Sequence, residues 1–166
     1  MIRVLEPDLA WAEQYAREVV RIALHAKRAL GRTEHVGGTA VPWLAARRTI
    51  DMLAFVSDDA HREGLGAVLR SIGYSPEARS EDPYVPPTWR YEGERSVRLF
   101  LVDEHDPFAT DALLVRDYLR THRTLADAYG AFKLEIAARE GVTEAAYAAA
   151  KIPFLESILR QANAPR

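Results

Sequence analysis

The sequence contains no cysteine among its 166 residues. Disulfide bonds, cysteine-based catalysis and metal sites built from thiolates are therefore excluded. No apolar run approaches the roughly 18 residues that a membrane-spanning helix needs, and residues 1–7 lack the apolar core of a secretory signal. We therefore expect a cytoplasmic protein that makes no membrane contact.

An excess of charge of one sign is missing as well. The 22 basic and 24 acidic residues give a formal net charge of −2, so there is no strong electrostatic case for a nucleic-acid partner. Apolar residues make up 48% of the chain and charged residues 28%, as in globular proteins. A chain of this length can bury one good core, which predicts a single domain over residues 1–166. No feature of the sequence indicates an oligomeric state.

The N-terminal half is predicted to mix strands and helices. Residues 49–56 are almost continuously apolar, which is typical of a central strand buried on both faces. Apolar residues at steps of three and four predict an amphipathic helix from Asp8, its N-cap, to about Leu30. The further elements expected here are a short strand over 2–5, an extended segment over 33–36 and a helix from a cap at 57–59 to about 72.

The C-terminal half is predicted to be a hairpin followed only by helices. A proline-bearing loop over 78–87 precedes two strands at 88–91 and 96–102. Three helices are expected to follow: one from Asp106-Pro107 to about 121, one to about 140 with Thr124 and Asp127 as a capping box, and one from Thr143 with a kink or break at Pro153. This order predicts an α+β fold, a small mixed sheet with packed helices and a helical C-terminal half.

A turn of small residues lies just ahead of the central strand. Residues 34–42 read Glu-His-Val-Gly-Gly-Thr-Ala-Val-Pro, and Asp51 follows within the strand. The backbone N–H groups of Gly37 and Gly38 could approach a phosphate closely, with Thr39 beside them. A plain tight turn is the alternative interpretation. With one carboxylate nearby, the layout favours a site for a phosphate-bearing ligand.

Several motifs together resemble the GrpB family, a group within the nucleotidyltransferase superfamily. They are the segment 34–42, Ile50-Asp51-Met52-Leu53, Arg116-Asp117-Tyr118-Leu119-Arg120, and the pairs Tyr129/Lys133 and Tyr147/Lys151. The resemblance covers nearly the whole chain. It implies a nucleotidyltransferase-like core, with the glycine turn at one end of a short mixed sheet and helices behind it.

The chain departs from the family's pattern at several places. Gly38 stands where the family usually has serine, Trp43 where glycine is common, and Arg98 and Phe100 where histidines are frequent. The first difference removes a hydroxyl that could bind phosphate. The resemblance therefore implies the fold more strongly than the reaction.

The carboxylates are too few for the usual chemistry of the superfamily. Nucleotidyl transfer normally uses two metal ions, held by carboxylates at positions i and i+2 of one strand. Asp51 is followed at i+2 by Leu53, and Arg98 stands near where a third carboxylate is expected. One carboxylate can still hold a Mg²⁺ that uses the ligand's phosphates, so we expect Asp51 to be a Mg²⁺ ligand or a general base. The alternative is a structural carboxylate whose burial is compensated by a partner.

Basic residues supply the rest of the expected site. If they converge on Asp51, they form an anion site; a solvated helix face with ion pairs is the alternative. His35 is predicted to be a catalytic acid or base, with a hydrogen-bonded structural histidine as the alternative. The basic residues expected to bind the ligand are Arg48, Arg98, Arg116, Arg120, Lys133 and Lys151.

Three functions stay open on these grounds. The leading hypothesis is a protein that binds a small anionic ligand, nucleotide- or phosphate-containing, and that could be a nucleotidyltransferase of unknown substrate. The second is a metal-independent enzyme acting on a small carboxylate or amine in specialised metabolism, with Asp51 or His35 as acid or base. The third is a non-catalytic binding module.

Overall fold

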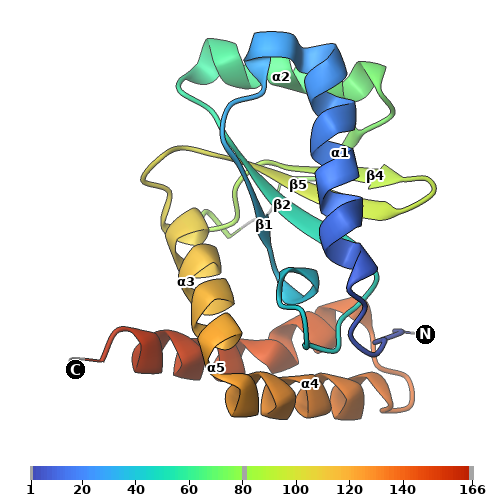
Figure 1. Cartoon of the computed structure of the whole chain (residues 1–166), viewed down its shortest axis with the longest axis vertical. Helices are drawn as coiled ribbons and strands as arrows, with labels where there is room; N and C mark the ends of the chain where they lie inside the picture. The colour runs from blue at the N-terminus through green and yellow to red at the C-terminus, as the bar shows by residue number, and fades with distance from the viewer. Residues whose placement is uncertain (1, 80–81, 165–166) are drawn as a thin grey trace.

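A five-stranded mixed sheet forms the centre of the protein. The computed structural model describes residues 2–79 and 82–164 (Figure 1). β2 (Thr49–Phe55) and β5 (Ser96–Val102) pair in parallel, and β1 (Thr33–Val36), β4 (Thr88–Glu92) and β3 (Ser75–Pro76) pair antiparallel to their neighbours. The spatial order is β1-β2-β5-β4-β3. The predicted α+β fold with a small mixed sheet is confirmed.

In the described part of the chain, five α-helices surround the sheet, and three of them follow its last strand. Their bounds are α1 Ala10–Ala26, α2 Asp59–Ser71, α3 Pro107–Thr121, α4 Arg123–Ala137 and α5 Glu144–Ala162. The predicted caps Asp58, Asp106 and Thr143 accept hydrogen bonds from N–H groups in the first turns of α2, α3 and α5. Among the described residues, no helix combines the length and apolarity that a membrane crossing needs.

Some predicted boundaries were wrong. Residues 2–5 form no strand, because Leu5 makes a single bridge to Ala46. The first helix ends at Ala26 rather than Leu30 and continues as a 3₁₀ turn, η1 (Lys27–Ala29). Strand β3 was not expected.

The start of α4 and the course of α5 also differ from expectation. Thr124 and Asp127 form no capping box, because Arg123 takes the Asp127 carboxylate at 3.0 Å. No break occurs at Pro153, which lies inside α5. Proline removes one helical hydrogen bond, but Phe154 and the buried Ile158 beyond it pack into the cluster shared by the C-terminal helices. This packing outweighs the lost bond.

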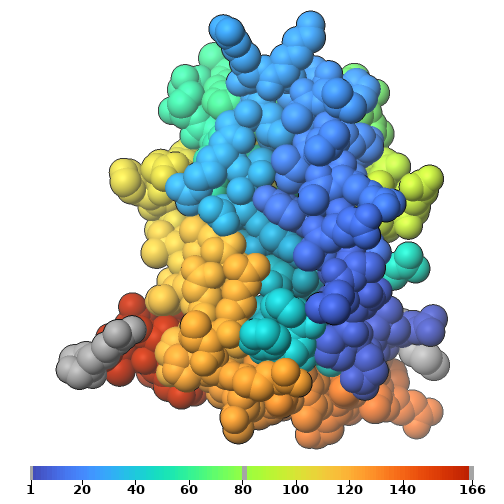
Figure 2. All heavy atoms as spheres, viewed as in Figure 1, coloured from blue at the N-terminus to red at the C-terminus, as the bar shows by residue number. Residues whose placement is uncertain are grey.

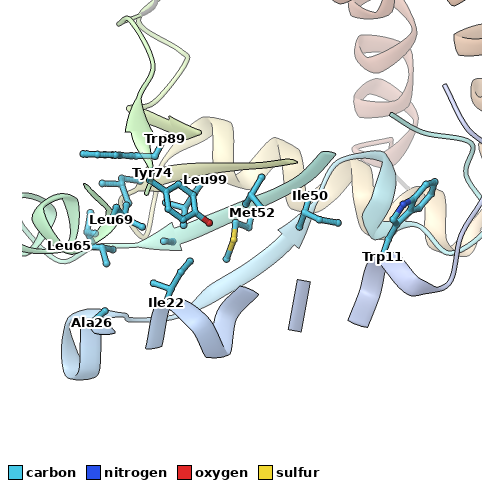
Figure 3. Packing of buried hydrophobic residues seen from close by; sticks show 14 of the residues in the cluster. Trp11, Ile22, Ala26, Ile50, Met52, Leu65, Leu69, Tyr74, Trp89 and Leu99 are labelled. Carbon is cyan, nitrogen blue, oxygen red and sulfur yellow. The ribbon is translucent and has the colours of Figure 1, made fainter. Parts of the chain in front are cut away.

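One face of the sheet is covered by α1 and α2 (Figures 1 and 3). Alternate residues of a strand point to opposite faces, so Met52 of β2 and its cross-strand partner Leu99 of β5 lie on this side. Ile22 from α1 and Leu65 and Leu69 from α2 pack against them. The predicted burial of the central strand on both faces is confirmed by the opposite side, where Leu53 is also fully buried.

The second face is divided between two sets of helices. Helix α3 covers the later parts of β2 and β5, where Phe108 and Ala109 pack on Leu53 and Phe100. Helices α4 and α5 lie across the end of the sheet opposite α2 (Figure 1). The first residues of β2 and β5 on this face therefore point toward α4 and α5 and carry no apolar cover of their own.

The buried carboxylate of Glu18 links α1 to the segment after α2 and to the turn between β4 and β5. Glu18 is 0% exposed and accepts hydrogen bonds from Arg21 and from Tyr74 Oη, both at 2.6 Å. Arg95 Nε lies 3.6 Å from the same carboxylate. Burial of this charge is tolerable only because these partners compensate its desolvation.

The substitution Glu18→Ala should therefore lower the free energy of unfolding by about 3–5 kcal/mol, since two arginines lose their buried partner. The matched control on the same helix is Glu13→Ala, whose exposed pair with Arg17 is expected to contribute about 0.5 kcal/mol or less. Urea denaturation measures both. Equal losses in the two variants would contradict the structural role given to Glu18.

Candidate functional site

A cavity of about 440 Å³ lies between the start of β2 and β5 and the C-terminal helices. The glycine turn forms one wall, the sheet forms the floor, and α3, α4 and α5 close the remaining sides. The structure brings eight of the predicted site residues to its lining: Gly37, Gly38, Thr39, Asp51, Arg98, Arg116, Lys133 and Lys151. His35, Arg48 and Arg120 are not among the lining residues.

Asp51 is packed directly against the turn. A Cβ built on Gly37 would lie 2.6 Å from Asp51 Oδ2, so only glycine leaves room for the carboxylate. The Gly37 backbone has φ 72° and ψ −167°, a conformation that is essentially restricted to glycine. Asp51 Oδ1 is buried without a hydrogen-bond partner in the described part of the chain. Burial raises the pKa of Asp51, and the nearby charges of Arg98 and Lys151 oppose that shift.

Arg98 lies directly across the parallel strand pair from Asp51. Its Nε is buried and has no hydrogen-bond partner among the described residues, and its Nη2 is 3.5 Å from Glu77 Oε2. Arg90, the next residue in the same row of the sheet, holds Glu77 more closely at 2.6 Å. An unpaired acceptor on Asp51 and an unpaired donor on Arg98 thus stand side by side at the cavity floor.

Two lysines reach the cavity from the C-terminal helices. Each Nζ lies 4.7 Å from the ring centre of the tyrosine one turn earlier, Lys133 over Tyr129 and Lys151 over Tyr147. Lys133 is 4% exposed, and a Cβ built on Gly38 would lie 3.1 Å from its Nζ. Burial and the neighbouring charge of Lys151 lower the pKa of Lys133 to about 7, against a smaller opposing effect of Asp51. Tyr129 and Tyr147 therefore position the two lysine amines at the cavity, in addition to packing between the helices.

His35 lies on the far face of the sheet from Asp51. It pairs with Met52, so strand alternation turns its ring toward α1, where it stacks on Tyr15 at 4.7 Å. Thr39 Oγ1 donates to Thr49 O, which leaves His35 Nε2 as the donor in its 3.0 Å bond to Thr39. Burial lowers the pKa of His35 to about 4, helped by Arg120 and Arg116. This neutral histidine holds the turn, which matches the structural alternative, and the predicted catalytic contact is not seen.

Arg116 and Arg120 tie α3 to the same turn. Arg116 Nη1 donates to Glu34 Oε2 at 2.7 Å and to His35 O at 3.0 Å. Arg120 donates through Nε and Nη2 to the carbonyl of Ala40 at 3.0 and 2.8 Å. Their guanidinium groups are thus committed to protein acceptors. Arg116 still borders the cavity, whereas Arg120 lies outside it.

Sequence reasoning missed four charged lining residues. Arg47 replaces the predicted Arg48, which is exposed, and Arg47 forms an ion pair with Glu144 at the rim. Arg90 could have been found, because the expected hairpin of residues 88–91 and 96–102 places it opposite Arg98. Glu77 gave no signal, since it follows the two-residue strand β3.

The side chains present do not fit a two-metal centre. Leu53, at the i+2 position, is fully buried in apolar packing, and Arg98 occupies the place beside Asp51. Within residues 2–79 and 82–164, no group of three histidine, aspartate or glutamate side chains could hold a metal ion. The charge around Asp51 is instead balanced by arginine and lysine, and a single Mg²⁺ held through ligand phosphates stays a prediction.

The substitution Gly37→Ala is expected to lower the free energy of unfolding by about 2 kcal/mol or more, because a methyl group would meet Asp51 and force a strained backbone. A matched control is Gly64→Ala in α2, where a Cβ meets nothing within 4 Å. That change should stabilise the protein by about 0.5–1 kcal/mol. Thermal unfolding of both variants is the measurement, and a neutral Gly37→Ala would be inconsistent with the described packing.

The substitution Lys133→Met should stabilise the protein most below pH 7. The folded-state pKa of about 7 lies under the ordinary value of 10.5, so protonated Lys133 penalises folding there. The penalty shrinks as pH rises from 7 and is lost near pH 10.5, where the unfolded lysine is also neutral. Urea denaturation across this range, with exposed Lys27→Met as the control, measures the difference. A stability difference that does not change with pH would refute the assigned environment.

Comparisons with known proteins agree with this architecture. A family model described as GrpB protein matches residues 1–161. A UPF0157 protein of Halalkalibacterium halodurans is 30% identical over 164 residues, which span 98% of this chain and 83% of the relative. A UPF0157 protein of Pseudomonas aeruginosa is 33% identical over 180 residues, spanning 98% of this chain and 68% of the relative.

Solved structures give the same result for the fold. The conserved protein GrpB from Enterococcus faecalis superposes with a TM-score of 0.84 at 26% identity, covering 96% of both chains. Cid1 poly(U) polymerase bound to Mg 3′-dATP gives a TM-score of 0.56 at 13% identity, covering 89% of this chain and 49% of Cid1. The second likeness concerns the fold alone and confirms its nucleotidyltransferase-like character. By sequence and by structure, the chain belongs to the GrpB family.

Proposed function

We propose that the cavity binds a small anionic molecule carrying a phosphate or carboxylate group. Six basic side chains line the cavity against three acidic ones, although the whole chain has a formal net charge of −2. The cavity therefore has a local excess of basic side chains that the chain as a whole does not have. Such a cluster raises the local concentration of anions and stabilises them once they are bound.

The observation that carries the proposal is a set of unused donors, one on the cavity floor and two on its helical sides. Arg98 Nε is buried without a partner, and the described residues offer no hydrogen bond or ion pair to the Nζ atoms of Lys133 and Lys151. A buried donor without a partner costs free energy, as does a buried charge. An anion placed between these groups would remove both costs.

A nucleotide or another phosphate compound is the first candidate ligand. The glycine turn brings backbone close to the cavity, and structures of Cid1, which shares the fold, contain MgGTP or the UTP analogue UMPNPP. In this proposal the backbone at Gly37 and Gly38 faces the phosphate, Arg98 and Lys151 neutralise it, and Asp51 handles a proton. Whether nucleotidyl transfer follows depends on Mg²⁺ recruited with the ligand.

The second candidate is a metal-independent enzyme acting on a small carboxylate or amine. The row Asp51–Arg98–Arg90 across the sheet favours it, because cations stand where a metal site would have carboxylates. Burial raises the pKa of Asp51 and thereby makes its carboxylate a better proton acceptor, which suits a proton-transfer role. Arginine would hold the substrate's carboxylate through charge-assisted hydrogen bonds.

Isothermal titration calorimetry with ATP and with pyrophosphate tests the proposal. The substitution Arg98→Gln should weaken binding roughly ten- to a hundredfold, since it removes a charged hydrogen bond of about 1.5–3 kcal/mol. The matched control is Arg48→Gln, which changes an exposed arginine just before β2, outside the cavity, and should bind like the wild type.

Titrations in Mg²⁺ and in EDTA separate the two candidates. Binding that needs Mg²⁺ favours the nucleotide candidate, and binding unchanged by EDTA favours the metal-independent one. The proposal fails if neither ATP, pyrophosphate nor a small dicarboxylate binds, or if both arginine variants lose affinity equally.

A further inference from the structure

The chain uses arginine for nearly all its positive charge. It has nineteen arginines and three lysines, Lys27, Lys133 and Lys151, and two of the three lysines line the cavity. Arginine stays protonated in proteins, whereas a lysine amine can lose its proton and act as a nucleophile. The cavity therefore holds a side chain chemistry that the rest of the chain almost entirely avoids.

Lys133 is the better placed of the two cavity amines. It is 4% exposed, borders the cavity and sits against the backbone of Gly38, where any larger residue would crowd its Nζ. Its Nζ lies over the face of the Tyr129 ring, and no ion pair joins it to a carboxylate among the described residues. Desolvation and a second amine nearby are the conditions that activate a lysine nucleophile.

A proton-transfer group stands beside this amine. Asp51 packs on Gly37 and Lys133 on Gly38, so consecutive glycines seat the carboxylate and the amine at one wall of the cavity. Asp51 acts on this amine by opposing the lowering of the Lys133 pKa, as a nearby carboxylate should. The unpartnered Oδ1 of Asp51 is free to accept or return a proton.

We propose that Lys133 forms an imine with the aldehyde or ketone group of a small anionic ligand, whose phosphate or carboxylate is held by Arg98 and Lys151. This inference rests on the proposed function, because the anion site is what would bring the carbonyl to the amine. It adds a substrate class, an anionic carbonyl compound, and a nucleophile that the motifs alone did not indicate.

The step is balanced without a cofactor. The lone pair of Lys133 Nζ forms a C–N bond as the carbonyl π electrons move to oxygen. Nitrogen loses a proton to Asp51 and the alkoxide oxygen takes one from solvent water, which gives a carbinolamine; the solvent proton accounts for the positive charge of the protonated imine formed at the end. Asp51 then returns its proton to the hydroxyl, the C–O bond breaks, water leaves, and the nitrogen lone pair completes the C=N bond.

Reductive trapping tests this inference on the wild-type protein. Glycolaldehyde phosphate is the probe, glycolaldehyde is its uncharged counterpart, and cyanoborohydride fixes any imine as a stable amine. Peptide mapping by mass spectrometry then compares the three lysines in one sample. Lys133 should be labelled at least about tenfold faster than exposed Lys27 by the phosphate probe. Uncharged glycolaldehyde should lose that preference.

Four further measurements make the outcome decisive. Pyrophosphate should slow the labelling of Lys133, and Asp51→Asn should slow it as well. The substitution Lys133→Arg keeps the charge but should abolish labelling in the cavity, whereas Lys27→Arg should leave labelling of Lys133 unchanged. Circular dichroism checks that each variant is folded. The peptide map of the labelled wild-type protein decides the question even if a variant does not fold.

The results also separate this inference from the proposed function. Labelling of Lys133 no faster than Lys27, or labelling confined to Lys151, overturns the imine proposal. If pyrophosphate binds by calorimetry in that case, the anion site stands and only the nucleophile is wrong. If pyrophosphate neither binds nor alters any labelling, the anion site itself fails.

Discussion

The contact between the Asp51 carboxylate and Gly37 is the constraint on which the cavity depends. A carboxylate at the start of a central strand needs compensation, yet Asp51 Oδ1 finds no donor among the described residues. Glycine at position 37 is what allows the carboxylate to remain there. Two surrounding cations, Arg98 across the sheet and Lys151 from α5, oppose the rise in the Asp51 pKa without forming close ion pairs with its carboxylate.

Packing elsewhere in the protein stabilises the fold enough to tolerate the unpaired oxygen of Asp51. Helices α1 and α2 bury one face of the sheet, and α3 buries the later half of the other. The turn is held independently by His35 through Thr39 and by Arg120 through the carbonyl of Ala40. Figure 2 shows the segment after β1 enclosed between α1 and the C-terminal helices on the viewed face. A well-packed set of helices and a hydrogen-bonded turn thus surround a few polar groups that lack hydrogen-bond partners.

Much of the frame was predictable because local chemistry determined it. The apolar run of β2, the caps Asp58, Asp106 and Thr143, and the turn at 92–94 all act over a few residues. The errors arose where distant packing decided the result. The helix passes through Pro153 because its later residues bury against α3 and α4, and β3 exists only because β4 offers it an edge.

The site was harder to predict than the frame. Asp51, Arg98 and the two lysines converge, but His35 was misplaced because its strand neighbours, not its distance from the turn, decide which face it takes. Arg116 and Arg120 share a helix face near the site, yet their donors are taken by Glu34, His35 and Ala40. Hydrogen-bond commitment of this kind depends on packing between segments 80 residues apart and has no local signature.

The most direct test of the anion site is a crystal structure of the protein grown with pyrophosphate or ATP. The account predicts a phosphate group between Arg98 and Lys151, close to the backbone of Gly37 and Gly38, with Asp51 beside it. A phosphate bound elsewhere while this cavity contains only water would contradict the central claim.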